Sequence, residues 1–288
     1  MRKSLTPVSV SVFIIVSIMM AGCSTTKTAT SDKQSPASLV YKLNSPEGYN
    51  YRQTTITDQL MEVEGQSVPV SSKTVMTFSI SDIDPGQEEI SFKVILDSMN
   101  VTVASMMEDM ANNPDVKGQS FMMSIKPNGK TGSLVGAEKI KIGAEIAGAG
   151  DLASSFAEIF PYFNRELVTP GETWPSTDTS NIKTAMMNSN SVTRSNNTFT
   201  GYVTVEGRKC AQIETTVEGK RDASINSQGM DMLMSMPFKG NEKILFDTEE
   251  GVIVRYEVAI AGSGFIEILS LGMDAGFSMN IKSILELK

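Results

Sequence analysis

Apolar and polar residues alternate with a period of two over long parts of this chain. Residues 76–80 carry Met, Phe and Ile at every second position, an Asp-Pro-Gly sequence at 84–86 interrupts the pattern, and residues 90–96 resume it. Such alternation is typical of β-strands with one buried face, and the interruption is typical of a turn. We therefore expect a β-hairpin here, with the Thr-rich and aromatic segment 49–63 paired beside it.

The C-terminal half of the chain repeats this alternation. Residues 199–205 and 211–217 flank a Glu-Gly turn, residues 243–246 and 252–258 flank an acidic turn, and residues 277–287 form a last alternating segment. β-Branched and aromatic residues are common in these segments, as is usual for strands on a half-buried sheet. Two more hairpins and a C-terminal strand are expected.

A different spacing occurs in the middle of the chain. Between residues 152 and 160, Leu, Phe and Ile recur at helical intervals, behind Asp151 and before Pro161. This spacing predicts a short amphipathic helix that is capped by the aspartate and ended by the proline. Helical spacing also occurs at 137–147, where glycines leave the end open, and a further helix is expected at 101–111.

The order of these elements predicts the fold class. Strands come first, a helical insert follows and strands return, which differs from the regular strand-helix alternation of parallel α/β folds. A flat sheet of many long strands would expose its edges, so this sheet is expected to curl. We predict a mainly β domain at 39–288, β with a few helices, built as a large curled antiparallel sheet or half-barrel with a short helical insert.

The N-terminus resembles a bacterial lipoprotein signal. Two basic residues precede an apolar run at 8–20, which is too short to cross a bilayer as a helix, and the sequence Met-Ala-Gly-Cys ends it at Cys23. The resemblance implies a signal peptide at 1–22, cleavage after Gly22, a diacylglycerol on the Cys23 thiol and acylation of the new amine. An ordinary secretory signal and an uncleaved anchor are the alternatives.

The segment after this cysteine is expected to be a tether. Residues 24–38 contain no aromatic or large aliphatic side chain, so 23–38 is predicted to be a flexible connection to the folded domain. Acyl chains on Cys23 would bury enough methylene groups to hold the protein on a membrane without a spanning helix. Ser24, after the cysteine, favours the outer membrane of a Gram-negative bacterium by the sorting rule of enteric lipoproteins.

Composition excludes several classes of chemistry. The chain has 25 basic and 33 acidic residues and a net charge of −8, which becomes −10 if residues 1–22 are removed with Arg2 and Lys3. An acidic surface argues against nucleic acid and anionic headgroups as partners. The sequence contains no His, which excludes His-based triads and His metal ligands. Cys210 is expected to be a small buried hydrophobic residue, because no His is present to activate its thiol.

Four methionines at every second position mark a candidate binding strand. Met230, Met232, Met234 and Met236 would share one face of an extended strand. Flexible thioether side chains adapt to irregular apolar shapes, so this face is the candidate lining of a groove for a lipid or a hydrophobic protein segment. Burial in the core under a helix and binding of Cu(I) are the alternatives.

Other motifs are interpreted as structural. Trp174 lies between two prolines and is expected to close one end of the core, with stacking against a ligand as the alternative. Residues 126–132 contain Gly-Lys-Thr but lack the first glycine of a phosphate-binding loop, so a polar turn is expected. Neither a nucleophile motif nor the ligand spacing of a metal site is present, so we expect no enzymatic activity, metal or cofactor.

Several short motifs resemble those of a family of exported bacterial lipoproteins of unknown function that is abundant in Gram-negative bacteria. They are the lipobox at 20–23, Asn128-Gly129-Lys130, Phe160-Pro161 leading to 170–174, and Phe246-Asp247 before Gly251. A looser likeness to the LolA/LolB/LppX-type lipid carriers rests on the anchor and the expected sheet. The resemblance implies a non-enzymatic, membrane-anchored protein of the cell envelope. We expect it to bind a lipid or other hydrophobic ligand in an apolar groove, with a structural or assembly role and no small ligand as the alternative.

Overall fold

A computed structural model describes residues 35–63, 65–105, 109–140, 152–183, 187–227, 230–269 and 272–288. The chain divides between residues 33 and 34, and all described residues belong to the second, compact part. A chain that begins after Cys23 therefore keeps every contact described below. The predicted cleavage after Gly22 and the lipidation of Cys23 lie outside the described residues.

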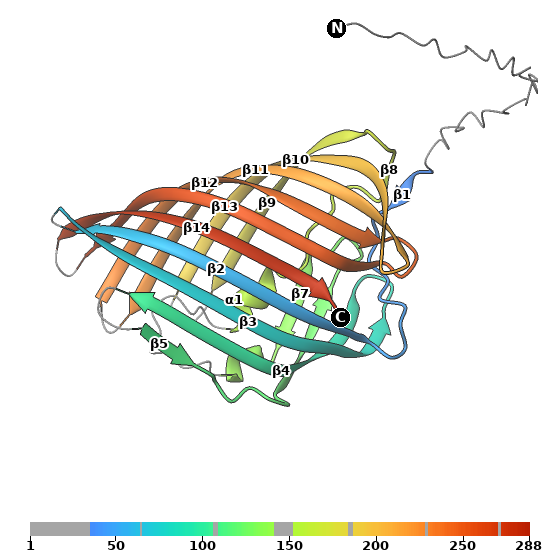
Figure 1. Cartoon of the computed structure of the whole chain (residues 1–288), viewed down its shortest axis with the longest axis horizontal. Coiled ribbons are helices and arrows are strands. Elements are labelled where there is room, and N and C mark those ends of the chain that lie inside the picture. The colour runs from blue at the N-terminus through green and yellow to red at the C-terminus, as the bar shows by residue number, and fades with distance from the viewer. Residues whose placement is uncertain are drawn as a thin grey trace, which may run out of the picture. The chain divides into compact units, whose positions relative to one another are not determined.

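Most of the described residues are in β-strands, with one short α-helix and one turn of 3₁₀ helix, η1 (Figure 1). The elements are β1 (Ala37–Ser38), β2 (Tyr49–Val63), β3 (Gln66–Pro85), β4 (Ile90–Ser105), β5 (Asp109–Asn112), β6 (Ser120–Ile125), β7 (Thr131–Val135), η1 (Ala137–Lys139), α1 (Leu152–Ala157), β8 (Leu167–Val168), β9 (Thr173–Lys183), β10 (Met187–Val205), β11 (Arg208–Ser227), β12 (Met230–Asp247), β13 (Val252–Ile268) and β14 (Met273–Leu287).

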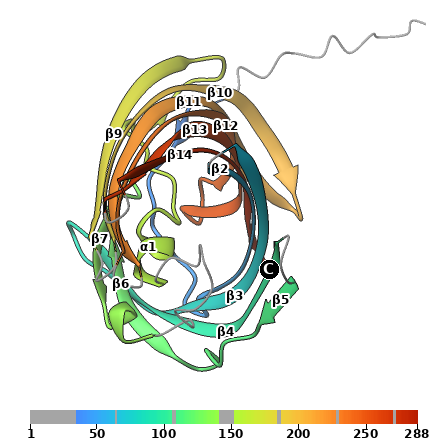
Figure 2. The same cartoon turned by 90° about the vertical axis from the view of Figure 1, so that its left-hand side faces the viewer.

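One antiparallel sheet contains twelve of these strands. Eleven follow the order β7-β6-β4-β3-β2-β14-β13-β12-β11-β10-β9, and β5 pairs with β4 beside this path. Because β2 pairs with β14, the first and last long strands lie together in the middle of the sheet. Figure 2 shows that the strands curl around α1, and the path ends at β7 and β9 without closing. The predicted mainly β fold, with a large curled antiparallel sheet and a short helical insert, is confirmed.

The hairpins follow the predicted alternation, but the helix expected at 101–111 is wrong. β4 continues through Val101 and Val103 to Ser105, and β5 then folds back to pair with it. Val101 and Val103 are each 4% exposed, with the β-branched Thr102 on the opposite face. Pairing with β3 satisfies the backbone of this segment, so its strand propensity prevails over a weak helical spacing.

The predicted helix at 152–160 is confirmed as α1, which is shorter than expected and ends at Ala157. Its Phe156 is fully buried, with the ring centroid 5.0 Å from that of Phe78 on β3 and 4.9 Å from that of Phe121 on β6. The helix therefore packs against the concave side of the sheet. Asp151 and residues 141–150 lie outside the described part of the chain. Of the helix expected at 137–147, the described residues form one turn of 3₁₀ helix, η1.

Aromatic side chains fill one half of the space inside the curl. The buried ring of Tyr41 lies between Phe160, Phe163 and Phe246, at centroid distances of 5.9, 5.7 and 5.3 Å. Its hydroxyl group donates a hydrogen bond of 2.9 Å to the Pro161 carbonyl oxygen. These contacts hold residues 37–43 and the loop after α1 in one core.

The turn at 126–130 packs tightly against this core. Gly129 has φ +88°, and a Cβ atom there would lie 2.3 Å from the Pro161 carbonyl oxygen and 2.6 Å from the Tyr41 ring. Only glycine fits a left-handed backbone under such close contacts. The predicted polar turn is confirmed, and its glycine is needed for packing.

The helix α1 and the loop after it form hydrogen bonds with both edges of the sheet. Thr131 at the start of β7 donates a hydrogen bond of 2.8 Å to the Ala157 carbonyl oxygen. On the other edge, Asn164 Nδ2 donates to the Pro175 carbonyl oxygen at 3.1 Å, and its Oδ1 accepts from Trp174 Nε1 at 3.0 Å. Trp174 is 1% exposed, which places it in the core as expected.

The short strand β1 pairs with β8, in the connection between α1 and β9. Ala37 is fully buried, and the hydroxyl group of Tyr202 donates to the Pro36 carbonyl oxygen at 3.1 Å. Ordered pairing thus begins at Ala37, two residues before the expected start of the domain at residue 39.

Candidate functional site

The concave side of the sheet encloses a cavity of about 710 Å³. Its walls come from β2, β3, β4, β7 and β9–β14, and the segment from Ser155 to Tyr162 closes one side. The volume lies within the range of about 300–1,000 Å³ that is usual for small-molecule sites. This cavity is the candidate functional site.

The inward side chains of β3 differ in size between its two ends. On β3 the concave positions are Ser72, Thr74, Met76, Phe78 and Ile80 in sequence. The last three are buried in the core, whereas the first two line the cavity with Met76. Large apolar residues therefore fill one half of the curl, and hydroxyl side chains leave space in the other half.

The cavity lining is amphipathic. One part is apolar and comes mainly from β12, β13 and β14: Met236, Phe238, Val258, Ile260, Met279 and Ile281. Another part consists of hydroxyl and amide side chains from β2, β3, β9 and β10, among them Thr55, Thr57, Ser180, Ser191 and Asn197. Such a lining suits a ligand that has both an apolar and a polar part.

Glu242 on β12 is a carboxyl group in the apolar part of this wall. Its side chain points to the concave face, as do those of Met236, Phe238 and Ile244 on the same strand. Its hydrogen-bond partner is the hydroxyl group of Tyr256 on β13. Both side chains keep some accessible surface, but that surface faces the cavity. Burial raises the pKa of Glu242 to about 7; the hydrogen bond from Tyr256 opposes this shift, and the nearby Glu158 adds to it.

Two ion pairs lie at the rim of the cavity. Arg221 on β11 donates from Nη2 to Oε2 of Glu158 at 3.0 Å, which ties the end of the helical insert to the wall. Lys130 Nζ lies 3.3 Å from Oδ1 of Asp178 on β9. Both pairs are partly exposed, so their contribution to stability is small, but they set the charge around the site.

The methionine strand is only partly in this site. Residues 230–236 are extended as predicted, and Met236 is 3% exposed and lines the cavity, in space that Gly262 leaves beside its sulfur. Met232 and Met234 lie in the same phase, opposite Ile268 and Ile266 on β13, and are partly exposed. The side chain of Met230 lies outside the described part. A ligand contact by these residues stays a prediction.

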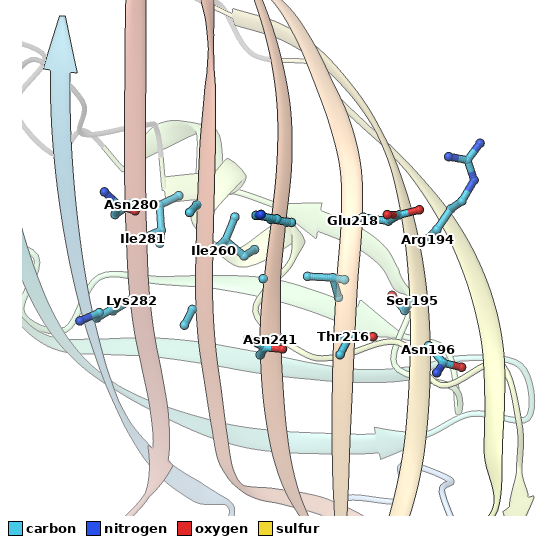
Figure 3. Close-up of a pocket in the computed structure, with 15 residues that line it drawn as sticks. Arg194, Ser195, Asn196, Thr216, Glu218, Asn241, Ile260, Asn280, Ile281 and Lys282 are labelled. Carbon is cyan, nitrogen blue, oxygen red and sulfur yellow. The ribbon is translucent and has the colours of Figure 1, made fainter.

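A second pocket, of about 620 Å³, lies across β10–β14 (Figure 3). Its exposed side chains are charged or polar, including Arg194, Glu218, Asn280 and Lys282, and the small Ala259 and Ala261 leave the depression between them. Solvated charges of mixed sign provide little desolvated contact surface, so we place the site in the cavity on the concave side.

The charged residues of the cavity were not predicted from the sequence. Glu242 and Arg221 each occupy an inward position between apolar residues of the same phase, such as Val217 and Ala223 on β11. That mismatch is a local signal which could have identified both. Glu158 lines the cavity because the helical insert packs inside the sheet, and Tyr256 lies beside Glu242 because β13 pairs with β12. No local sequence pattern shows either contact.

The described residues contain no group of three or more His, Cys, Asp or Glu side chains that could hold a metal ion. Within the same ranges, none of the helices is long and apolar enough to span a membrane. Cys210 is buried on the opposite face of the sheet, against Leu245 and Val254. Burial raises the pKa of its thiol to about 11, with Asp247 adding to the shift.

Comparison with known proteins gives weak similarity only. No protein-family model matches the chain, and no curated protein matches it. A crystal structure of a candidate exported protein with a YmcC-like fold from Bacteroides fragilis is similar with 9% identity and a TM-score of 0.25, over 88% of this chain and 99% of that one. OpdK of Pseudomonas aeruginosa, solved with vanillate, is similar with 5% identity and a TM-score of 0.15, over 83% of this chain and 98% of that one. At these values neither structure assigns a function to this chain.

Proposed function

We propose that this protein is a non-enzymatic lipoprotein of the bacterial cell envelope that binds a lipid or another amphiphilic molecule in the concave cavity. The observation that carries the proposal is the cavity itself, of about 710 Å³, with an apolar and a polar part. A filled interior would have suited the alternative, a structural or assembly protein without a small ligand. Here one half of the curl is filled and the other half is hollow.

A blocking substitution tests the location of the ligand. Met279 on β14 lines the cavity, and the adjacent Asn280 is exposed on the opposite face. In the soluble chain 24–288, Met279→Trp should fill part of the cavity and raise the dissociation constant of the neutral probe N-phenyl-1-naphthylamine at least about tenfold, or about 1.4 kcal/mol. Fluorescence titration measures this constant.

Asn280→Trp is the matched control, because it adds the same side chain on the outer face of the same strand. It should leave the dissociation constant of the probe unchanged. Equal binding by wild type and Met279→Trp would remove the cavity from the proposal. Failure of the wild type to bind any apolar probe would favour the structural or assembly role.

The proposed anchor is tested at Cys23. Full-length protein expressed in cells fed a palmitate analogue should incorporate the label, and Cys23→Ser should abolish the incorporation and leave the precursor uncleaved, because the acylated thiol is lost. Cys210→Ser changes the other cysteine and should keep the label. Labelling of Cys23→Ser, or release of an unlabelled soluble wild-type protein, would contradict the anchor.

A further inference from the structure

The charges around the cavity are unevenly paired. The titratable side chains that line it with Glu242 are Lys130, Glu158, Tyr162, Asp178, Arg221 and Tyr256. Lys130 is paired with Asp178 and Arg221 with Glu158. Among these described side chains, Glu242 is the carboxyl group whose hydrogen-bond partner, Tyr256, is neutral.

A carboxylate in such a place favours a positive charge in the ligand. Ionised groups taken out of bulk water are stable only when they are paired. Glu242 has a hydroxyl partner, and the two cations of the cavity wall are already paired with other carboxylates. Aromatic side chains attract cations through their π faces, and Tyr256 and Phe238 line the same space. The raised pKa of Glu242, about 7, agrees with a carboxyl group that lacks a positive partner.

Anionic ligands are disfavoured by the same arrangement. With Glu242 ionised, the described side chains along the cavity comprise two cations and three carboxylates. The Nη2 atom of Arg221 already donates a hydrogen bond to Glu158, and its Nε atom is buried without a hydrogen-bond partner. The chain as a whole carries a net charge of −8, which attracts cations over longer distances.

Resting on the proposed ligand-binding function, we propose that the ligand is a cationic amphiphile. Its amine or quaternary ammonium group lies beside Glu242 and Tyr256, and its apolar part lies against Phe238, Ile260 and Met279. The hydroxyl groups of β3 and β10 then face the remaining solvent in the cavity.

The test compares three amphiphiles with the same alkyl chain on the soluble chain 24–288. Decyltrimethylammonium, decanol and decanoate compete for the bound neutral probe, each below its micelle concentration or, for decanol, its solubility limit. We expect decyltrimethylammonium to bind at least about tenfold more tightly than decanoate. Glu242→Gln keeps the shape of the side chain. It should lower the affinity for decyltrimethylammonium at least about tenfold and change the affinity for decanol less than about twofold. Glu218→Gln, on the exposed outer face, should change none of the three.

A pH series gives an independent measurement. Decyltrimethylammonium keeps its charge at every pH, so any pH dependence of its affinity comes from the protein. If only ionised Glu242 binds the cation, a pKa of about 7 predicts an affinity about thirtyfold higher at pH 8 than at pH 5.5. Glu242→Gln should remove this dependence.

The possible outcomes are separable. Decanol binding without a preference for the cation, or a preference that persists in Glu242→Gln, would overturn the inference and leave the proposed function standing. Tighter binding of decanoate would assign the polar end of the ligand to Arg221 or Lys130 and would also overturn the inference. Failure of all three amphiphiles to bind would overturn the proposed function together with the inference.

Discussion

Phe156→Ala should lower the free energy of unfolding by about 3–5 kcal/mol. Phe156 is fully buried between the rings of Phe78 and Phe121, so its removal leaves a void between α1 and two strands of the sheet. Urea denaturation of the soluble chain 24–288 measures the change.

Phe265→Ala is the matched control for this prediction. Phe265 lies on the outer face of β13 and is 69% exposed, so the same substitution there should change the free energy of unfolding by less than about 0.5 kcal/mol. A cost below about 1 kcal/mol for Phe156→Ala would contradict the packing of α1 against the sheet. It would also contradict the inference that α1 fills one half of the space inside the curl.

Glu242→Gln should remove a loss of stability of about 3 kcal/mol that the wild-type protein undergoes as the pH rises from 4.5 to 8. The pKa of Glu242 is raised from 4.5 to about 7 in the folded protein, so between these values the folded state binds more protons than the unfolded state. Stability therefore falls as the pH rises through this range, at about 1.4 kcal/mol for each pH unit. The glutamine variant lacks this loss.

The measurement is the free energy of unfolding of both proteins between pH 4.5 and pH 8. The two proteins should agree within about 0.5 kcal/mol at the acidic end, where Glu242 is neutral in the folded state and half ionised in the unfolded state, and the variant should be more stable by about 3 kcal/mol at pH 8. Tyr256→Phe should have the opposite effect above pH 7, because the Tyr256 hydroxyl group stabilises the carboxylate. Parallel pH profiles for wild type and Glu242→Gln would show that the carboxyl group is well solvated.

The strands could be predicted from the sequence because the buried face of each strand leaves a period-two pattern in its own residues. Residues 76–80 and 90–96 alternate in the sequence and form β3 and β4, whose inward residues are buried. The error at 101–111 has a physical cause: this segment is held in a long strand by pairing with β3, a contact about 30 residues away in the chain. Local spacing does not contain that contact.

The cavity was less predictable than the sheet. Met236 belongs to the predicted methionine strand and does line it. The other walls come from β2, β3, β4, β7, β9–β11, β13 and β14, which meet only when the sheet curls. Whether a concave position is filled depends on α1 and on Phe160, which the sequence places in an insert far from those strands. Glu242 could have been identified from the sequence, because it is a carboxyl group at an inward position of a strand whose other inward residues are mostly apolar.

We propose that the hollow half of the curl holds an amphiphilic ligand. The most direct measurement is native mass spectrometry of chain 24–288 secreted to the periplasm by an ordinary cleavable signal, with Met279→Trp prepared in parallel and the lipids extracted from both. We predict one bound amphiphile per wild-type chain, carrying a cationic group, and its loss from Met279→Trp. Wild-type protein that is free of bound molecules and also fails to bind N-phenyl-1-naphthylamine would contradict ligand binding in the cavity.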